Sequence, residues 1–282
     1  MSTATMDSRA PAKPERFYRH RLVTRMTHWT NALALGILLF SGLAILNSHP
    51  SLYWGQYGAD ADKPFIHWGA VHTAHGWRGV TTIAGYSFDT TGVFGLSSVD
   101  GQIRDRAYPW WLTLPSRHDL GASRQWHFFF AWVLVLNGLI YWLFGFISRH
   151  IQRDIALKKG ELEPKHLLED VIHHAQLKAP RGEASKSYNT LQKLAYLAVI
   201  FGLIPLMVLT GLTMSPGFNA IVPYLLDLFG GRQSARTIHF LTANFLVLFF
   251  LVHIFEVFVA GAWNEIRSMV TGWYVVKPEK VK

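Results

Sequence analysis

The sequence predicts an all-α integral membrane protein built on a four-helix transmembrane bundle. Half of its 282 residues are hydrophobic, and they gather in four blocks with few or no charges. Each block has about 18 to 25 residues, enough for a helix to cross the hydrocarbon core of a bilayer. A helix in a soluble core would be shorter and would carry a charged face. The predicted spans are residues 29–46, 126–147, 191–214 and 238–262.

The segments between these spans differ in length and character. Residues 47–124 form a long loop rich in Gly, Trp and Thr. A loop of this length is expected to be folded, because simple connections are much shorter. Residues 148–190 are polar and include a short amphipathic helix at about 162–177. We expect the whole chain, residues 1–282, to be a single membrane domain.

The positive charge is distributed unevenly between the loops. Six Lys and Arg lie in residues 1–28, nine in 148–193 and four in 263–282, but only two in 215–236. By the positive-inside rule, both termini and the loop 148–190 are cytoplasmic. The loop 47–124 is then external, in a multi-pass protein of the bacterial inner membrane. This segregation explains the net charge of +9 without a nucleic-acid partner.

The chain has no cysteine, which excludes several redox centres. A cysteine-ligated iron–sulfur cluster, a disulfide and a covalently attached c-type haem are all impossible. A redox cofactor here must be held by His, Met or weaker ligands, and non-covalent b-type haem meets that restriction.

Four histidines lie in or at the start of the apolar spans, and two of them share one span. His239 and His253 are fourteen residues apart, close to four turns of a helix and a rise of ~21 Å. Both rings therefore point the same way at two depths of the bilayer, as two stacked haems require. Depth pairs His127 with His239 near the external face, and His28 with His253 near the cytoplasmic face.

Three of these histidines follow an arginine by three residues, in an Arg-x-x-His pattern at the start of a span. The arginines are Arg25, Arg124 and Arg236. Such an arginine lies about one turn nearer the aqueous surface on a similar helix face. Guanidinium groups pair well with carboxylates, so we expect these arginines to bind the haem propionates.

Two segments resemble the bacterial di-haem cytochrome b membrane subunits of nickel–iron hydrogenases and formate dehydrogenases. One is the last span with its two histidines and the following Gly261-Ala-Trp-Asn-Glu. The other is Tyr188-Asn-Thr-Leu-Gln-Lys before the third span, which ends in Leu-Thr-Gly211. The resemblance covers all four spans. It implies two b-type haems and electron transfer between a periplasmic catalytic subunit and the quinone pool.

The resemblance also implies a quinone site beside the cytoplasmic haem. On the matching positions, Asn189 and His253 would contact the quinone, with Gln192 and Lys193 nearby. From the residues alone, a helix cap is the better explanation of Asn189.

The partner is less defined, because the loop 47–124 is longer than in those subunits. Its Phe88-Asp-Thr-Thr-Gly92 resembles a subgroup associated with periplasmic molybdopterin oxidoreductases of the sulfite-oxidase type. Hydrogenase, formate dehydrogenase and periplasmic cytochrome partners remain open. The alternative is a stand-alone transmembrane haem reductase that passes electrons to an external acceptor.

Overall fold

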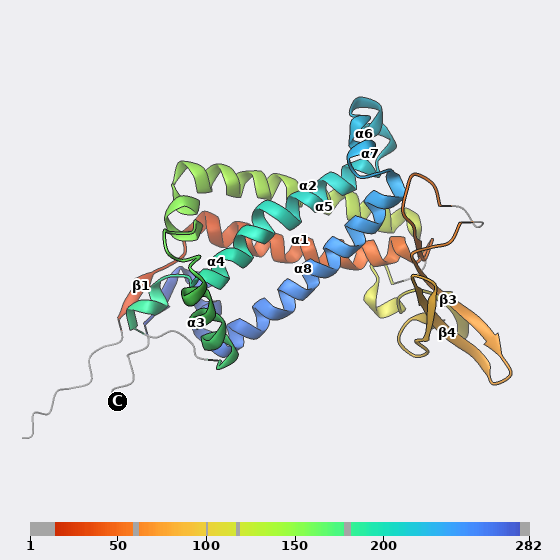
Figure 1. Ribbon diagram of the computed structural model, residues 1–282, viewed down its shortest axis with the longest axis horizontal. Coiled ribbons are helices and arrows are strands. Elements are labelled where there is room, and N and C mark those ends of the chain that lie inside the picture. The colour runs from red at the N-terminus through yellow and green to blue at the C-terminus, as the bar shows by residue number, and fades with distance from the viewer. Residues whose placement is uncertain (1–14, 59–61, 100, 117–118, 178–181, 277–282) are drawn as a thin grey trace, which may run out of the picture. The chain divides into compact units, whose positions relative to one another are not determined.

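The computed structural model describes residues 15–58, 62–99, 101–116, 119–177 and 182–276. Within them, four helices are long and apolar enough to cross a membrane (Figure 1). They are α1 (Leu22–Leu46), α2 (Leu120–Ile147), the helix Thr190–Thr213 and α8 (Arg232–Ala260). The third consists of α4 (Thr190–Leu197), a π-helical stretch η4 (Ala198–Leu203) and α5 (Ile204–Thr213).

These helices agree with the predicted spans, except that three begin six or seven residues earlier. Polar residues such as Arg25, Ser123 and Arg236 lie in these added turns. A helix can continue beyond its apolar block, since its polar first turns remain in water or among lipid headgroups. Hydropathy alone therefore places the start of these helices too late.

The chain is not purely α-helical, which corrects the predicted fold class. The strands are β1 (Arg16–Tyr18), β2 (Ser51–Leu52), β3 (Ile66–Thr73), β4 (Gly76–Ile83), β5 (Tyr86–Asp89), β6 (Gly95–Val99), β7 (Gln102–Arg106) and β8 (Trp273–Val275). The other helices are η1 (Trp110–Leu112), η2 (Ile151–Ile155), α3 (Pro164–Ala175), η3 (Gly182–Lys186), α6 (Pro216–Ile221), α7 (Tyr224–Leu228) and α9 (Ala262–Thr271).

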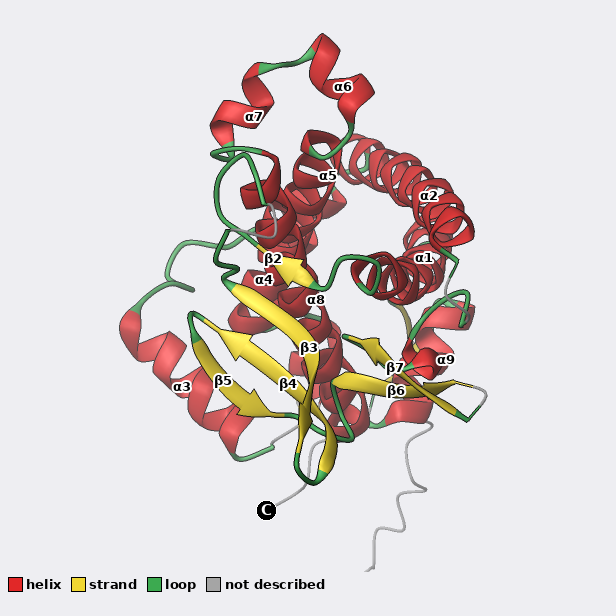
Figure 2. Ribbon diagram, turned by 90° about the vertical axis from the view of Figure 1, so that its right-hand side faces the viewer, coloured by secondary structure: helices red, strands yellow, loops and turns green. Residues whose placement is uncertain are grey.

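The predicted long loop between the first two spans holds most of these strands (Figure 2). Strands β2 to β5 form an antiparallel sheet in chain order, and β6 pairs with β7 as a hairpin. Ala84 and Gly85 join β4 to β5 with positive φ values of 49° and 87°. Positive φ at both central residues defines the type I′ turn, whose twist matches the right-handed twist of the two strands that it joins.

The chain divides into two compact units, and the long helices run through both. The first comprises Met1–Met26, Phe144–Tyr196 and Leu251–Lys282, and the second comprises Thr27–Leu143 and Leu197–Phe250. In the first unit, β1 pairs with β8, and α3 contacts the start of α4. There the backbone N–H of Thr190 donates to Asp170 Oδ2 at 3.1 Å.

The second unit joins the sheet to the helices through an apolar cluster. Its buried members are Leu46, Leu52, Ile66, Trp68 and Ala107. Trp68 of β3 packs edge-on against Phe240 of α8, with ring centroids 5.4 Å apart. Asn47, just after α1, exchanges two hydrogen bonds with the backbone of Tyr108, at 2.9 and 3.1 Å. The sheet is therefore fixed to both α1 and α8.

In the same unit, loop residues cap the N-terminus of α8. The backbone N–H groups of Gln233 and Ser234 donate to the Gly55 carbonyl at 3.1 and 3.0 Å. The first N–H groups of a helix lack partners within it, so this contact satisfies two of them. Gly231 precedes α8 with φ +107°, and a Cβ there would lie 2.6 Å from the Gln56 backbone. Only glycine suits both conditions.

Candidate functional site

Two imidazoles face each other between α2 and α8. The ring centroids of His127 and His239 lie 6.3 Å apart, with their planes at 60°. Each histidine is the eighth residue of its helix, so both rings lie about two turns inside the helix start. The structure thus brings together two histidines that the sequence pairs by depth.

Each ring is held from its Nδ1 side by a hydroxyl group of a third or fourth helix. Ser41 of α1 lies 3.0 Å from His127 Nδ1, and Thr210 of α5 lies 2.9 Å from His239 Nδ1. Both hydroxyls are fully buried. Four helices of the second unit therefore meet at this site.

The hydrogen bonding favours one tautomer for both rings. Each hydroxyl lies within hydrogen-bond distance of the carbonyl four residues earlier in its own helix, at 2.7 Å for Ser41 and 2.6 Å for Thr210. When the hydroxyl proton is donated to that carbonyl, the hydroxyl accepts from the imidazole, and the proton of each ring is on Nδ1. This leaves a free lone pair on each Nε2.

A glycine follows each of these hydroxyl residues and lies against the ring. A Cβ on Gly42 would be 3.3 Å from Cε1 of His127, and one on Gly211 would be 3.6 Å from Cε1 of His239. The site thus contains two copies of one arrangement, a hydroxyl residue and a glycine facing an imidazole. Sequence reasoning missed Ser41 and Thr210. The repeated hydroxyl–Gly dipeptide was the available signal.

The two rings fit a metal ion that receives its other ligands from a cofactor. Metal–imidazole bonds are about 2 Å long, so one ion bound to two Nε2 atoms separates the ring centroids by about 6 Å. The described residues include no cluster of three or more His, Asp or Glu that could hold an ion alone. A porphyrin would supply the remaining ligands of such an ion, and the hydroxyls of Ser41 and Thr210 would be the outer hydrogen-bond partners that orient the two histidines.

The other two predicted ligands lie in different compact units. His28 is on α1 in the second unit, with its ring edge-on to Trp29 at 5.2 Å. Nearby, Asn137 of α2 donates to Asn31 Oδ1 at 2.6 Å and fixes α1 to α2. His253 is on the part of α8 in the first unit. The units are not placed relative to each other, so the pairing of His28 with His253 stays a prediction.

The three arginines have structural contacts in addition to their predicted role. Arg236 donates to the carbonyls of His49 and Ser51 at 2.7 and 3.0 Å, which fixes the loop before β2 to α8. Arg25 donates to a carbonyl near the end of α9. Arg124 is exposed at the start of α2, and its guanidinium lies 5.6 Å from the ring centroid of Phe128. Binding of haem propionates by these arginines stays a prediction.

The residues matched to a quinone site form the start of α4. Asn189 Oδ1 accepts from the backbone N–H of Gln192 at 2.9 Å, and the Asn189 N–H donates to Gln192 Oε1 at 3.4 Å. This reciprocal pair is a capping box, the structural alternative to the predicted quinone role. Lys193 is buried and donates to Glu161 Oε1 at 2.7 Å. Quinone binding by these residues stays a prediction.

Comparison with known proteins gives the family. Residues 19–272 match the family described as prokaryotic cytochrome b561. A protein named as a subunit of protein-methionine-sulfoxide reductase, YedZ1 of Azospira oryzae, is 35% identical over 153 residues, which cover 54% of this chain and 72% of that protein. A protein named as cytochrome YdhU of Escherichia coli is 28% identical over 263 residues, covering 92% of this chain and 75% of that protein. No solved structure matches the chain.

The family match confirms the resemblance to bacterial cytochrome b membrane subunits. It covers all four long helices and both facing histidines. Membership implies b-type haem and membrane electron transfer, and it fits a protein of the bacterial inner membrane. The chain belongs to the prokaryotic cytochrome b561 family.

Proposed function

We propose that the chain carries electrons across the bacterial inner membrane through two b-type haems, between a periplasmic redox partner and the quinone pool. The observation that supports this most is the facing pair of His127 and His239, each with a free Nε2. Two axial imidazoles leave no open position on a haem iron, which favours electron transfer over oxygen binding.

In this proposal, His127 and His239 hold the external haem, which supplies one-electron redox chemistry. Ser41 and Thr210 keep both imidazoles in the ligating tautomer. Gly42 and Gly211 leave room for the Cε1 edges of the two rings.

The second haem is assigned to His28 and His253, as the sequence predicts. The support comes from α8, which is continuous from Arg232 to Ala260 and so carries both His239 and His253. Fourteen residues of this helix separate the two rings by ~21 Å along its axis. Two haems held at these levels would connect the two membrane faces.

The quinone is assigned to the neighbourhood of His253, at the predicted cytoplasmic level. Asn189 and Lys193 belong to the same compact unit as His253, which is compatible with this assignment. The capping box engages Asn189 Oδ1, and its Nδ2 group is left 3.4 Å from His174 Nε2. His253 is therefore the residue on which the quinone proposal mainly rests.

A periplasmic oxidoreductase is the proposed partner on the external face. The relative in Azospira oryzae is named as a subunit of a reductase, which favours a partnered role over a stand-alone reductase. The folded segment between α1 and α2 is fixed to α8 near His239 by Arg236, so it offers a rigid surface beside the external site. A molybdopterin-dependent enzyme agrees with the loop resemblance.

Co-purification distinguishes a subunit with a periplasmic partner from a stand-alone reductase. We expect the tagged chain, extracted in mild detergent, to retain an oxidoreductase subunit that reduces or oxidises its haem. A chain that purifies alone from its native membrane and still reduces a soluble external acceptor with full activity would support the stand-alone reductase.

Replacing one ligand should remove one haem and leave the other. We expect His239→Ala to lower the pyridine-haemochrome ratio from about two to about one haem per chain. His75→Ala, an exposed histidine in the turn between β3 and β4, is the control and should keep both haems. Retention of two haems in His239→Ala would contradict the ligand assignment.

Bulk at Gly42 should displace the ring of His127. A Cβ there already comes within 3.3 Å of the ring, and the methyl groups of Gly42→Val would overlap it. We expect haem content to fall toward one per chain. Gly36→Val is the matched control on the same helix, because a Cβ at Gly36 meets nothing within 4 Å. Equal haem loss in both variants would show a general helix defect instead.

Removing one hydroxyl should change the reduction potential of the external haem. Thr210→Val keeps the shape but removes an acceptor for His239 Nδ1–H. A less polarised imidazole is a weaker donor to ferric iron, so the midpoint potential should rise by an amount on the order of tens of millivolts. Thr213→Val is the control. Thr213 is equally buried, but its hydroxyl donates to the Leu209 carbonyl. Redox titration showing the same shift in both variants would contradict the role of Thr210.

A further inference from the structure

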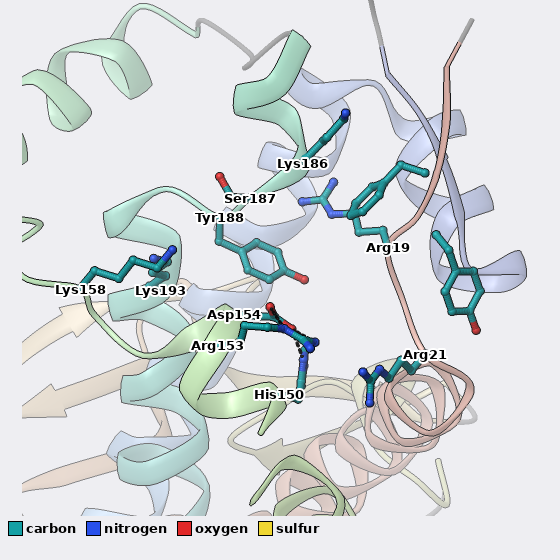
Figure 3. Close-up of a pocket in the computed structure, with 12 residues that line it drawn as sticks. Arg19, Arg21, His150, Arg153, Asp154, Lys158, Lys186, Ser187, Tyr188 and Lys193 are labelled. Carbon is teal, nitrogen blue, oxygen red and sulfur yellow. Dashed lines mark hydrogen bonds and ion pairs between the residues drawn. The ribbon is translucent and has the colours of Figure 1, made fainter. Parts of the chain in front are cut away.

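The first compact unit contains a pocket of about 480 Å³ that is lined by none of the four proposed haem ligands (Figure 3). Its walls come from β1 and the residues leading to α1, from the π-helical turn η2, and from the segment between η3 and α4. This volume lies within the ~300–1,000 Å³ range of small-molecule sites.

The pocket lies at the ends of three of the membrane-spanning helices. Arg21 immediately precedes α1, His150 follows α2 by three residues, and Tyr188 precedes α4 by two residues. The ends of such helices lie at the level of the lipid headgroups. Phe17, Tyr18 and Tyr188 line the pocket as well, and aromatic side chains are enriched at that level.

The lining is strongly cationic. Its Lys and Arg residues are Arg19, Arg21, Arg153, Lys158, Lys186 and Lys193. Asp154 is the one carboxylate among the lining residues, and two neighbouring side chains balance its negative charge. Arg153 Nε donates to it at 2.8 Å, and His150 Nδ1 lies 2.7 Å away. Burial alone would raise the pKa of Asp154, but these two partners lower it, so the group is an ion-paired carboxylate.

Two of the cations remain available for a ligand. Arg21 and Lys158 are exposed, and neither forms an ion pair within the part of the chain that the structure describes. Other lining cations are paired with acids that do not line the pocket, as in the Lys193–Glu161 pair at 2.7 Å. The carboxylate partners of these cations are therefore not among the residues that line the pocket.

Two tyrosine rings lie on either side of the Arg19 guanidinium. The Arg19 guanidinium lies 5.2 Å from the ring centroid of Tyr188 and 4.8 Å from that of Tyr274. Figure 3 shows the Tyr188 ring between Arg19 and the Arg153–Asp154–His150 group. Burial raises the pKa of Tyr188, so its hydroxyl stays protonated and can donate a hydrogen bond. A guanidinium and a phenol thus lie side by side in the lining of the pocket.

We propose that this pocket binds the phosphate group of an anionic phospholipid at the membrane surface. Phosphate oxygens accept hydrogen bonds from guanidinium and ammonium groups, and basic pockets between transmembrane helices bind such headgroups. Free phosphate shares this chemistry, but the position at three helix ends suits a ligand anchored in the bilayer. A quinone ring is uncharged and gains little from these cations. None of the four proposed haem ligands lines the pocket, and Lys193 is the one lining residue that the proposed quinone site also uses.

The experiment uses the full haem-loaded chain, delipidated in a zwitterionic detergent. Native mass spectrometry measures binding of phosphatidylglycerol, with phosphatidylcholine of the same acyl chains as the uncharged-headgroup probe. The test variant is R21Q/K158Q. The matched control is R16Q/K159Q, which has the same net charge and alters exposed neighbours that do not line the pocket. The haem spectrum confirms folding, and the single variants R21Q and K158Q serve if the double variant is unstable.

We expect one phosphatidylglycerol to bind with at least about tenfold preference over phosphatidylcholine, and R21Q/K158Q to lose at least about tenfold in affinity. R16Q/K159Q should change by less than about twofold. An equal loss of phosphatidylglycerol affinity in both double variants would show that the lipid is attracted only by the general positive charge. That result would contradict a specific site in the pocket. Displacement of the lipid by millimolar inorganic phosphate would assign the pocket to a soluble anion, and displacement by decylubiquinone would assign it to the quinone. Either result overturns the lipid proposal.

Discussion

The facing imidazoles of His127 and His239 are the arrangement on which the membrane-embedded site depends. Two polar rings in an apolar environment are costly unless their hydrogen-bonding groups are satisfied. Ser41 and Thr210 satisfy one nitrogen of each ring, and they do so as acceptors, because their own protons are donated to helix carbonyls. What remains on each ring is one Nε2 lone pair, which the iron of the proposed haem would use.

The folded segment between α1 and α2 supports this site from one end. The start of α8 has N–H groups with no partner in the helix, and Gly55 and Gln56 supply acceptors for them. Thr237, two residues before His239, donates to the Tyr53 carbonyl at 2.6 Å. The loop therefore caps α8, the helix that carries His239. It also presents a sheet beside that ligand, where an external partner could dock.

The four long helices, the facing histidines and the capping of α4 follow from local sequence properties. Hydropathy gives the spans, helical spacing gives the depths of the histidines, and Asn189 with Gln192 is a recognisable capping box. Asn189 shows that a residue carried over from a family can have a complete local explanation as well. A role in quinone binding must therefore be tested separately from its role at the helix start.

The strands and the hydroxyls of Ser41 and Thr210 could not be predicted from local sequence properties. Glycines such as Gly79 and Gly95 interrupt the alternating pattern of the short strands in the loop, and they permit close backbone approach. Ser41 and Thr210 are common residues in membrane helices, and their meaning comes only from a histidine on another helix. Contacts between distant elements decide both features, and no local pattern encodes them.

The most direct measurement is a cryo-EM map of the full chain in a lipid nanodisc, at a resolution that separates porphyrin from side chains. We expect a porphyrin between His127 and His239, with iron on both Nε2 atoms and both Nδ1 atoms facing the hydroxyls of Ser41 and Thr210. A map in which these two rings touch each other without a porphyrin between them, or in which the haem is bound by other residues, would contradict the central assignment.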